Sequence, residues 1–257
     1  MLDARPLWLC EIFSAIQGEG PFVGERQVFV RCAGCNLRCV YCDQPEALVR
    51  TERCRVEQTA GRRDWVWIDN PMAIDEVHRA VRQIDQPRGL HRSVSLTGGE
   101  PLLQAEALQE LAGHLRVVGL RIYLETHGAL PQKLAIMNGE IDVIAMDLKI
   151  PSSSGEKPLW DEHREFLNVG RSFLTDTATF VKVVVDERIT SDEIETAARL
   201  VAEQNAPIPF IIQPVTKFGD SGEPPSPHRL LELQALASRF LKDVRVIPQT
   251  HKMIGQL

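Results

Sequence analysis

Short apolar runs rich in β-branched residues alternate with amphipathic segments from about Ser93 to the end of the chain. This alternation is typical of βα units, in which helices cover parallel strands. Apolar residues spaced at three and four positions, as at Leu108, Leu111 and Leu115, predict helices between the runs. The pattern therefore predicts an α/β fold. Its expected strands are 93–96, 121–125, 143–149, 179–185, 209–213 and 244–247.

Polar residues mark where two of these helices begin. Thr190-Ser191-Asp192-Glu193 has the form of a capping box, in which the side chains at the two ends bond each other's backbone. Ser226-Pro227 places a capping residue before a proline, which suits the first turn of a helix. Both motifs predict helix starts.

The first third of the chain departs from this rhythm. We expect a strand at 27–31 that runs directly into a cysteine-rich loop, and an earlier strand at 7–13 that pairs outside the barrel. Residues 62–67 alternate in strand fashion, which predicts a hairpin or flap inserted at about 50–70. Barrel enzymes build their sites at the carboxyl ends of the strands, so the loop after 27–31 is the expected site.

Composition and charge exclude several classes of protein. The chain has 257 residues, 44% hydrophobic and 25% charged, so it is not disordered, collagen-like or a coiled coil. Its formal net charge of -6 gives no general attraction to phosphate backbones, so no nucleic-acid partner is expected. With no apolar run of about 20 residues and no secretory leader, we expect no membrane partner and a cytoplasmic location. The length suits one domain, 1–257, ending in a strand and tail at 243–257.

Four of the six cysteines lie between Cys32 and Cys42, which in a reducing compartment indicates a metal site and not disulfides. The spacing Cys35-x3-Cys39-x2-Cys42 puts three thiolates on one short loop. They can hold three corners of an iron-sulfur cube and leave the fourth iron open to chelate a substrate. A structural zinc site needs four ligands, and Cys32 supplies a fourth sulfur for that alternative or for a closed cluster. The spacing alone leaves both possibilities open.

Tyr41 stands just before the last of these cysteines, and the loop resembles the hallmark of the radical S-adenosylmethionine (SAM) superfamily. The resemblance implies a partial (β/α)6 TIM-like barrel with a [4Fe-4S] cluster on Cys35, Cys39 and Cys42. The open iron would take the amino and carboxylate groups of SAM. Electron transfer from the reduced cluster would then cleave SAM to a 5'-deoxyadenosyl radical. An external electron donor of the flavodoxin or ferredoxin type is also implied.

The same resemblance assigns other strand-end motifs to SAM. Thr97-Gly98-Gly99-Glu100-Pro101 looks like the glycine-rich segment that meets the SAM amino group, whereas on its own it is a tight βα connection. Asp147 and Lys149 share one face at a strand end, where the alternative is a simple salt bridge. The resemblance implies that Asp147 binds the ribose hydroxyls of SAM and that Lys149 binds its carboxylate. The residues assigned to SAM are Tyr41, Asp43, Gly98, Gly99, Glu100, Asp147, Lys149, Gln213, Pro214, Val215 and Thr216.

Further motifs narrow the resemblance to one family. Residues 11–20, 29–31, 34–39 and 248–252 read EIFSAIQGEG, FVR, GCNLRC and PQTHK, and in this order they resemble 7-carboxy-7-deazaguanine synthase. That family converts 6-carboxytetrahydropterin to 7-carboxy-7-deazaguanine on the route to deazapurine nucleosides such as queuosine. The resemblance implies hydrogen abstraction from the substrate, ring contraction, loss of ammonia and regeneration of SAM. It also implies a homodimer.

A flat pterin presents an amide-and-amine edge, which the backbone at 16–18 and the Glu19 carboxylate can match. The alternative is a glycine-rich turn with a solvated acid. Arg31 can clamp the substrate carboxylate with its guanidinium fork, although a lone arginine is otherwise a surface residue. His251 is expected to hydrogen-bond the pterin or to assist proton transfer. The residues assigned to the substrate are Ile16, Gln17, Gly18, Glu19, Arg31, Thr97, His251 and, through its carboxylate, Leu257.

The chain departs from the family pattern near the cluster. The family usually has a threonine two residues after the last cysteine, whose hydroxyl ligates Mg²⁺, and this chain has Gln44. An amide oxygen also suits Mg²⁺, although the longer side chain has to sit differently, so we expect Gln44 to be the magnesium ligand. His127 replaces the family's usual asparagine, and we expect the backbone to satisfy it. Cys32 is expected to be a buried thiol and not a ligand.

Two alternative functions stay open at this point. An activase that installs a glycyl radical on a partner protein would share the cysteine spacing and the short barrel. A non-catalytic zinc or iron-sulfur module would use Cys32 together with the other three cysteines of the loop.

Overall fold

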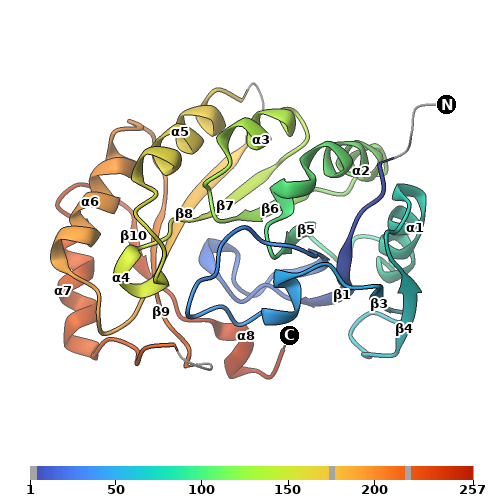
Figure 1. Cartoon of the computed structure of the whole chain (residues 1–257), viewed down its shortest axis with the longest axis horizontal. Coiled ribbons are helices and arrows are strands. Elements are labelled where there is room, and N and C mark those ends of the chain that lie inside the picture. The colour runs from blue at the N-terminus through green and yellow to red at the C-terminus, as the bar shows by residue number, and fades with distance from the viewer. Residues whose placement is uncertain (1–4, 174–176, 218–220, 257) are drawn as a thin grey trace.

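The fold is given by a computed structural model, which describes residues 5–173, 177–217 and 221–256. One ten-stranded sheet runs through the molecule in the order β10-β9-β8-β7-β6-β5-β2-β1-β3-β4 (Figure 1). Its strands are β1 Leu9–Ile16, β2 Arg26–Cys32, β3 Arg53–Glu57, β4 Trp65–Asp69, β5 Ser93–Gly98, β6 Ile122–Thr126, β7 Val143–Asp147, β8 Ala178–Val185, β9 Phe210–Pro214 and β10 Val244–Val246.

Parallel pairing joins all neighbouring strands from β2 through β5 to β10. The strands β2 and β5 to β9 are the six expected of a partial (β/α)6 barrel, and β10 extends the set. Within the described ranges the sheet stays open, with β10 and β4 at its edges. The prediction of an α/β fold with a parallel sheet is confirmed.

Helices lie outside the sheet in an arc that runs from α7 and α6 through α5, α3 and α2 to α1 (Figure 1). The helices are α1 Ile74–Ile84, α2 Ala105–Val117, α3 Pro131–Ile136, α4 Pro151–Ser154, α5 Trp160–Arg171, α6 Ser191–Ala202, α7 Pro227–Ala237 and α8 Thr250–Met253, with 3-10 turns η1 Gly20–Phe22, η2 Pro45–Leu48 and η3 Pro101–Gln104. In the part of the chain that is described, no helix is long and apolar enough to cross a membrane.

Both capping motifs act as expected. The Thr190 hydroxyl accepts a hydrogen bond from Glu193 N at 3.2 Å, and the Glu193 carboxylate accepts from Thr190 N at 3.1 Å. The Ser226 hydroxyl accepts from Arg229 N at 3.2 Å. Each cap satisfies backbone groups that the first turn of a helix leaves without a partner. Helices α6 and α7 therefore begin where the sequence predicted.

Side chains on each strand alternate between the helix-covered core and an inner face. On β2, Val28 and Val30 lie in the core beneath the helices, whereas Phe29 and Arg31 lie on the inner face. A parallel sheet is buried on both faces, so its strands stay apolar until their carboxyl ends. The same alternation brings a polar side chain of each following strand, β5 to β9, to the inner face. These side chains are Thr97, Glu125, Asp147, Lys182 and Gln213.

The N-terminal strand and the inserted hairpin extend the sheet beyond β2. β1 pairs antiparallel with β2 and spans Leu9–Ile16, two to three residues later than the expected 7–13. The insertion forms the hairpin of β3 and β4, and β3 pairs in parallel with β1, with Glu11 opposite Arg55. The hairpin is thus part of the main sheet, because it satisfies the backbone groups that the edge of β1 would otherwise leave unpaired.

Helix α5 carries a fully buried histidine behind the inner face. His163 Nε2 lies 3.1 Å from His127 O and donates a hydrogen bond to it. Burial lowers the pKa of His163 to about 4, so the ring is neutral in the folded protein at neutral pH. The bond fixes the turn that follows β6.

The pKa of His163 makes stability depend on pH. The unfolded chain binds a proton here near pH 6.5 and the folded protein only near pH 4, so folding loses stability as the pH falls through this window. Between about pH 6.5 and 5 this group should lower the free energy of unfolding by about 2 kcal/mol. Anaerobic urea denaturation of wild type and His163→Asn checks this, since the variant should lack that part of the pH dependence. His228→Asn, at an exposed histidine of α7, is the matched control and should behave as wild type. Equal pH dependence of wild type and His163→Asn would contradict the assignment.

Candidate active site

A cavity opens on the inner face, at the carboxyl ends of the parallel strands. It gathers most of the side chains that the sequence assigned to ligands. Glu100 and Pro214 are not part of its lining, and Leu257 lies outside the described residues. The assigned residues that line it are Ile16, Gln17, Gly18, Glu19, Arg31, Cys35, Cys39, Tyr41, Cys42, Asp43, Gln44, Thr97, Gly98, Gly99, Asp147, Lys149, Gln213, Val215, Thr216 and His251.

Backbone bonds hold the cysteine loop over one side of the cavity. Gly34 N donates to Ala47 O at 2.8 Å, and Val40 N donates to Ser154 O at 2.9 Å, which ties the loop to η2 and to α4. Within the loop, Cys42 N donates to Cys39 O at 3.0 Å. The loop is therefore shaped by main-chain contacts, and its cysteine side chains are left to face the cavity.

The three cavity cysteines suit an iron-sulfur cube. Among the residues that the structure describes, no three histidine, cysteine or acidic side chains converge on one metal-ion position. Cys35, Cys39 and Cys42 all line the cavity, so each can give one sulfur to a corner of a cube. Burial raises the pKa of the Cys39 thiol to about 11, so its thiolate depends on the charge of a bound metal.

The other cysteines lie apart from this lining. Cys32 is fully buried in the helix-side core, as expected, and burial raises the pKa of its thiol. Cys54 is buried in the same core. Cys10 is half-buried at an irregularity in the pairing of β1, and its thiol lies 3.9 Å from Cys32 O and 3.8 Å from Glu46 O.

Two charged groups at the end of β7 lie beside Tyr41. Lys149 Nζ is 3.0 Å from Asp147 Oδ2 and 5.2 Å from the centre of the Tyr41 ring. Burial by itself would lower the pKa of Lys149, but the Asp147 carboxylate outweighs burial and the pKa lies well above its usual value. The salt bridge that was the alternative for these two residues therefore forms inside the cavity wall, with both groups charged, and their contacts to SAM stay a prediction.

Two buried oxygen atoms near this ion pair have no hydrogen-bond partner within the described part of the chain. They are Asp147 Oδ1 and Gln213 Oε1. A buried acceptor without a partner is uncommon in a folded protein and indicates a ligand or a water. Both atoms can accept hydrogen bonds from the hydroxyl and amine groups of a nucleoside, such as the adenosine part of SAM.

The glycine turn after β5 packs directly on the cysteine loop. A Cβ at Gly99 would clash with Gly34 O, so only glycine allows this contact. Glu100 is fully buried, and its carboxylate accepts from Thr126 Oγ1 at 2.8 Å and from His127 N at 3.0 Å. That carboxylate lies behind the cavity wall, so its contact with SAM stays a prediction.

The protein holds both ring nitrogens of His127, and Nε2 also lies 3.3 Å from Glu100 Oε2. Ala129 N donates to His127 Nδ1 at 3.1 Å, so Nε2 carries the hydrogen and donates to Asn36 Oδ1 at 2.9 Å. Burial lowers the pKa of His127, so its ring is neutral at neutral pH. The ring thereby links the turn after β6 to the cysteine loop.

A hydrogen-bonded group of three side chains lines the cavity near β5 and β6. Glu125 Oε1 accepts from Gln17 Nε2 at 2.8 Å, and Oε2 accepts from Thr97 Oγ1 at 2.6 Å. Sequence reasoning missed Glu125, although its place near the end of β6 was a usable signal. A carboxylate beside an amide offers both acceptors and donors to a planar polar ligand.

Arg31 is buried and joined to the inserted hairpin. Its side chain packs 5.6 Å from the centre of the Phe13 ring. Arg31 Nε donates to Glu11 Oε1 at 2.7 Å, and Arg55 Nε donates to Glu11 Oε2 at 2.7 Å. One carboxylate thus accepts hydrogen bonds from two guanidinium groups. The three side chains together carry a net positive charge, which favours an anionic ligand.

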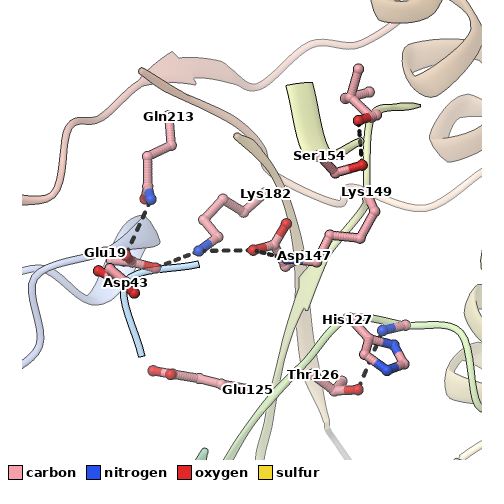
Figure 2. A network of polar contacts seen from close by, with 12 residues as sticks. Glu19, Asp43, Glu125, Thr126, His127, Asp147, Lys149, Ser154, Lys182 and Gln213 are labelled. Atoms are coloured by element: carbon pink, nitrogen blue, oxygen red, sulfur yellow. Dashed lines mark hydrogen bonds and ion pairs between the residues drawn. The ribbon is translucent and has the colours of Figure 1, made fainter. Parts of the chain in front are cut away.

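Lys182 is a charged cavity residue that sequence reasoning missed. Its Nζ bonds Glu19 Oε2 at 2.5 Å and Asp147 Oδ2 at 3.2 Å (Figure 2). Burial by itself would lower the pKa of Lys182, but the Asp147 and Glu19 carboxylates raise it above its usual value. Burial by itself would raise the pKa of Glu19, which Lys182 holds below its usual value. The only sequence signal was a lysine inside the apolar run 179–185.

The C-terminal tail lies against the loop that carries Glu19. Thr250 N donates to Gly18 O at 2.9 Å, and Gln249 Nε2 donates to Glu19 Oε1 at 2.8 Å. A Cβ at Gly18 would clash with His251, so glycine is required for this packing. Burial lowers the pKa of His251, which leaves its ring neutral and able to donate and accept.

Asp43 and Gln44 follow the last cavity cysteine and line the same space. Lys252 Nζ lies 2.6 Å from Asp43 Oδ2. Burial by itself would raise the pKa of Asp43, but the bond from Lys252 lowers it. The Gln44 side chain makes no capping bond to η2, so its amide is not committed to that helix end.

Comparison with known proteins shows the family to which the chain belongs. The Radical SAM superfamily model matches residues 29–202. Over 249 residues the chain is 47% identical to the 7-carboxy-7-deazaguanine synthase of Geobacter sulfurreducens, covering 96% of each protein. The chain belongs to the 7-carboxy-7-deazaguanine synthase family. The Methanopyrus kandleri synthase is 34% identical, with 95% of this chain and 92% of the relative covered.

Solved structures share the fold of this synthase-family chain. A crystal structure of QueE from Escherichia coli matches with a TM-score of 0.60 and 19% identity, over 95% of this chain and 94% of that one. A radical SAM methyltransferase from Sphaerobacter thermophilus matches with a TM-score of 0.61 and 17% identity, over 87% and 66%. Membership of the radical SAM superfamily implies a [4Fe-4S] cluster and SAM as cofactors and an external reductant.

The assignment of the cluster ligands predicts how cysteine variants behave. Cys39→Ala should lose the cluster, because two sulfurs do not retain it, whereas Cys32→Ala should keep the wild-type iron content, because its thiol lies in the core. Iron and sulfide analysis of anaerobically purified protein, together with visible absorbance, measures both. Circular dichroism controls for folding. Loss of iron from Cys32→Ala with an intact fold would show that a fourth sulfur binds the metal.

Proposed function

We propose that this chain converts 6-carboxy-5,6,7,8-tetrahydropterin to 7-carboxy-7-deazaguanine and ammonia, as a radical SAM carbon-nitrogen lyase. The observation that carries the proposal is one cavity in which acceptors for a nucleoside and groups for a carboxylated pterin meet beside Cys35, Cys39 and Cys42. Relatives named as this synthase, at 47% and 34% identity, support it. The product acid is a precursor class for deazapurine nucleosides such as queuosine.

The cofactor side of the cavity fits the groups that SAM presents. The cluster and SAM, once bound, supply hydrogen-atom abstraction at the substrate carbon that bears the carboxylate. Lys149 provides a fixed positive charge for the SAM carboxylate, and the open Asp147 Oδ1 accepts from a ribose hydroxyl. Gly99 N already donates to Cys32 O at 3.0 Å. The carbonyl oxygens of the glycine turn are therefore the groups that can accept from the amino group of SAM. Tyr41, Gln213, Val215 and Thr216, which line the same cavity, complete the contacts to the adenosine.

The substrate side fits a planar amide with an anionic substituent. Gln17, Glu19 and Glu125 provide amide and carboxylate groups that match the pterin edge. Arg31 uses its Nε for Glu11, which leaves its terminal nitrogens, within the described part of the chain, for the substrate carboxylate. His251 lies on Gly18 and is neutral, so it can hold a proton of the pterin.

Magnesium and protein partners are further parts of the proposal. Gln44 lines the cavity beside the cysteine loop, and its amide oxygen is a ligand type that Mg²⁺ accepts. We propose that the ion meets the substrate carboxylate there. The electron donor is of the flavodoxin or ferredoxin type, and the enzyme acts as a homodimer.

An anaerobic assay tests the reaction. Cluster-loaded enzyme with SAM, a reductant and 6-carboxytetrahydropterin should yield the deazaguanine acid and ammonia, detected by mass spectrometry. Arg31→Met should lower kcat/KM by roughly 10- to 100-fold, since a charged hydrogen bond contributes about 1.5–3 kcal/mol. Arg92→Met, at an exposed arginine beyond the site, is the control. SAM cleavage without the deazaguanine product would favour a different radical enzyme.

Metal dependence tests the role of Gln44. Added Mg²⁺ should stimulate chelator-treated wild type, whereas Gln44→Ala should lose that stimulation because no side-chain oxygen replaces the amide. Gln44→Thr, which restores a hydroxyl, should recover it. The comparison uses kcat/KM across a magnesium titration. Equal metal dependence in wild type and Gln44→Ala would remove Gln44 from the ligand set.

A further inference from the structure

Lys182 stands between the two sides of the cavity, and the proposed reaction gives it no ligand of its own. Its ammonium bonds Glu19 Oε2, on the pterin side, at 2.5 Å and Asp147 Oδ2, on the SAM side, at 3.2 Å. The side chain is only 14% exposed. Figure 2 shows the three side chains in a row, from the loop after β1 to β8 and β7. One buried cation therefore joins the two carboxylates that receive different ligands.

We propose that Lys182 is a positioning residue that couples the binding of SAM to the binding of the pterin substrate. The inference rests on the proposed function, because it needs both ligands to enter this cavity. It assigns to Lys182 neither a proton transfer nor a direct bond to a reacting atom.

The two carboxylates depend on the shared ammonium. Buried like charges repel each other, and an unpaired buried carboxylate takes up a proton or turns toward water. With Lys182 between them, Glu19 and Asp147 both stay ionised and face the same cation. A movement of this one side chain therefore affects both carboxylates, although Asp147 is also held by Lys149.

On the pterin side, hydrogen-bond donors of the protein occupy most of the acceptor positions of the Glu19 carboxylate. Oε1 accepts from Gln213 Nε2 at 3.1 Å and from Gln249 Nε2 at 2.8 Å, while Oε2 accepts from Lys182. A carboxylate offers about four acceptor positions, so about one is left for a ligand. The bond from Lys182 fixes the direction in which this remaining position points.

On the SAM side, Asp147 has one oxygen in ion pairs and one open. Oδ2 contacts Lys149 at 3.0 Å and Lys182 at 3.2 Å, and Oδ1 is without a partner among the described residues. A ligand hydroxyl at Oδ1 would order the carboxylate, the ammonium of Lys182 and, through it, Glu19. The second ligand then binds a site that is already ordered and loses less conformational entropy. Such coupling is reciprocal for the two ligands.

The test uses cluster-loaded enzyme without a reductant, so that SAM and 6-carboxytetrahydropterin bind without reacting. Isothermal titration calorimetry gives the Kd of each ligand with and without saturation by the other. In wild type we expect each ligand to lower the Kd of the other by roughly 5-fold or more, within the usual range of coupling between sites. In Lys182→Met, which keeps an unbranched side chain one atom shorter and removes the charge, we expect each Kd to become independent of the other ligand.

Control variants separate coupling from folding. Lys242→Met removes an exposed lysine away from the cavity and should show wild-type coupling. If Lys182→Met does not retain iron, Lys182→Gln keeps a donor without the charge and should show the same loss of coupling. Wild-type coupling in a folded, iron-loaded Lys182 variant overturns the inference, and so does independent binding in wild type. Absence of pterin binding to wild type would instead overturn the proposed function together with the inference.

Discussion

Charge buried on the inner face of the sheet has to be matched by opposite charge, and this constraint organises the site. Removing one partner from a buried ion pair costs several kcal/mol, because an uncompensated charge remains. In the cavity, acidic and basic side chains from segments far apart in the chain form ion pairs with one another. The amide of one glutamine joins two of the acidic side chains. In spatial order these groups are Lys252, Asp43, Gln249, Glu19, Lys182, Asp147 and Lys149. Tail, cysteine loop and strands are thereby held in one arrangement.

A second group of matched charges gives the inserted hairpin a structural role in the site. Glu11 on β1 lies between Arg31 on β2 and Arg55 on β3. Without Arg55, the pair of Glu11 and Arg31 would be neutral. The hairpin therefore contributes the positive charge that the group presents to an anionic ligand, although Arg55 itself is not part of the cavity lining.

The cysteine loop is held by backbone contacts together with bonds from polar and charged side chains, among them the guanidinium of Arg38, which donates to Cys35 O. It is held to η2 and α4 by main-chain bonds, and the glycine turn after β5 fits beneath it only because Gly99 has no Cβ. The Glu100 carboxylate joins this turn to His127 N, and the ring of His127, which lines the cavity, bonds Asn36 in the cysteine loop. These bonds hold the loop in place while Cys35, Cys39 and Cys42 line the cavity.

The sequence by itself determined the α/β fold, the cysteine loop at the end of β2, and the capped starts of α6 and α7, because period, spacing and capping chemistry are local properties. It also placed Asp147 and Lys149 together at a strand end. Only the tertiary structure decided that Lys182 and Glu125 belong to the site and that the carboxylate of Glu100 lies behind it. The alternation of side chains along β8 shows which face of the strand Lys182 lies on, but the sequence does not show which side chains surround it. Those neighbours are fixed when strands and loops distant in sequence meet across the sheet, where long-range packing decides which charges share a partner.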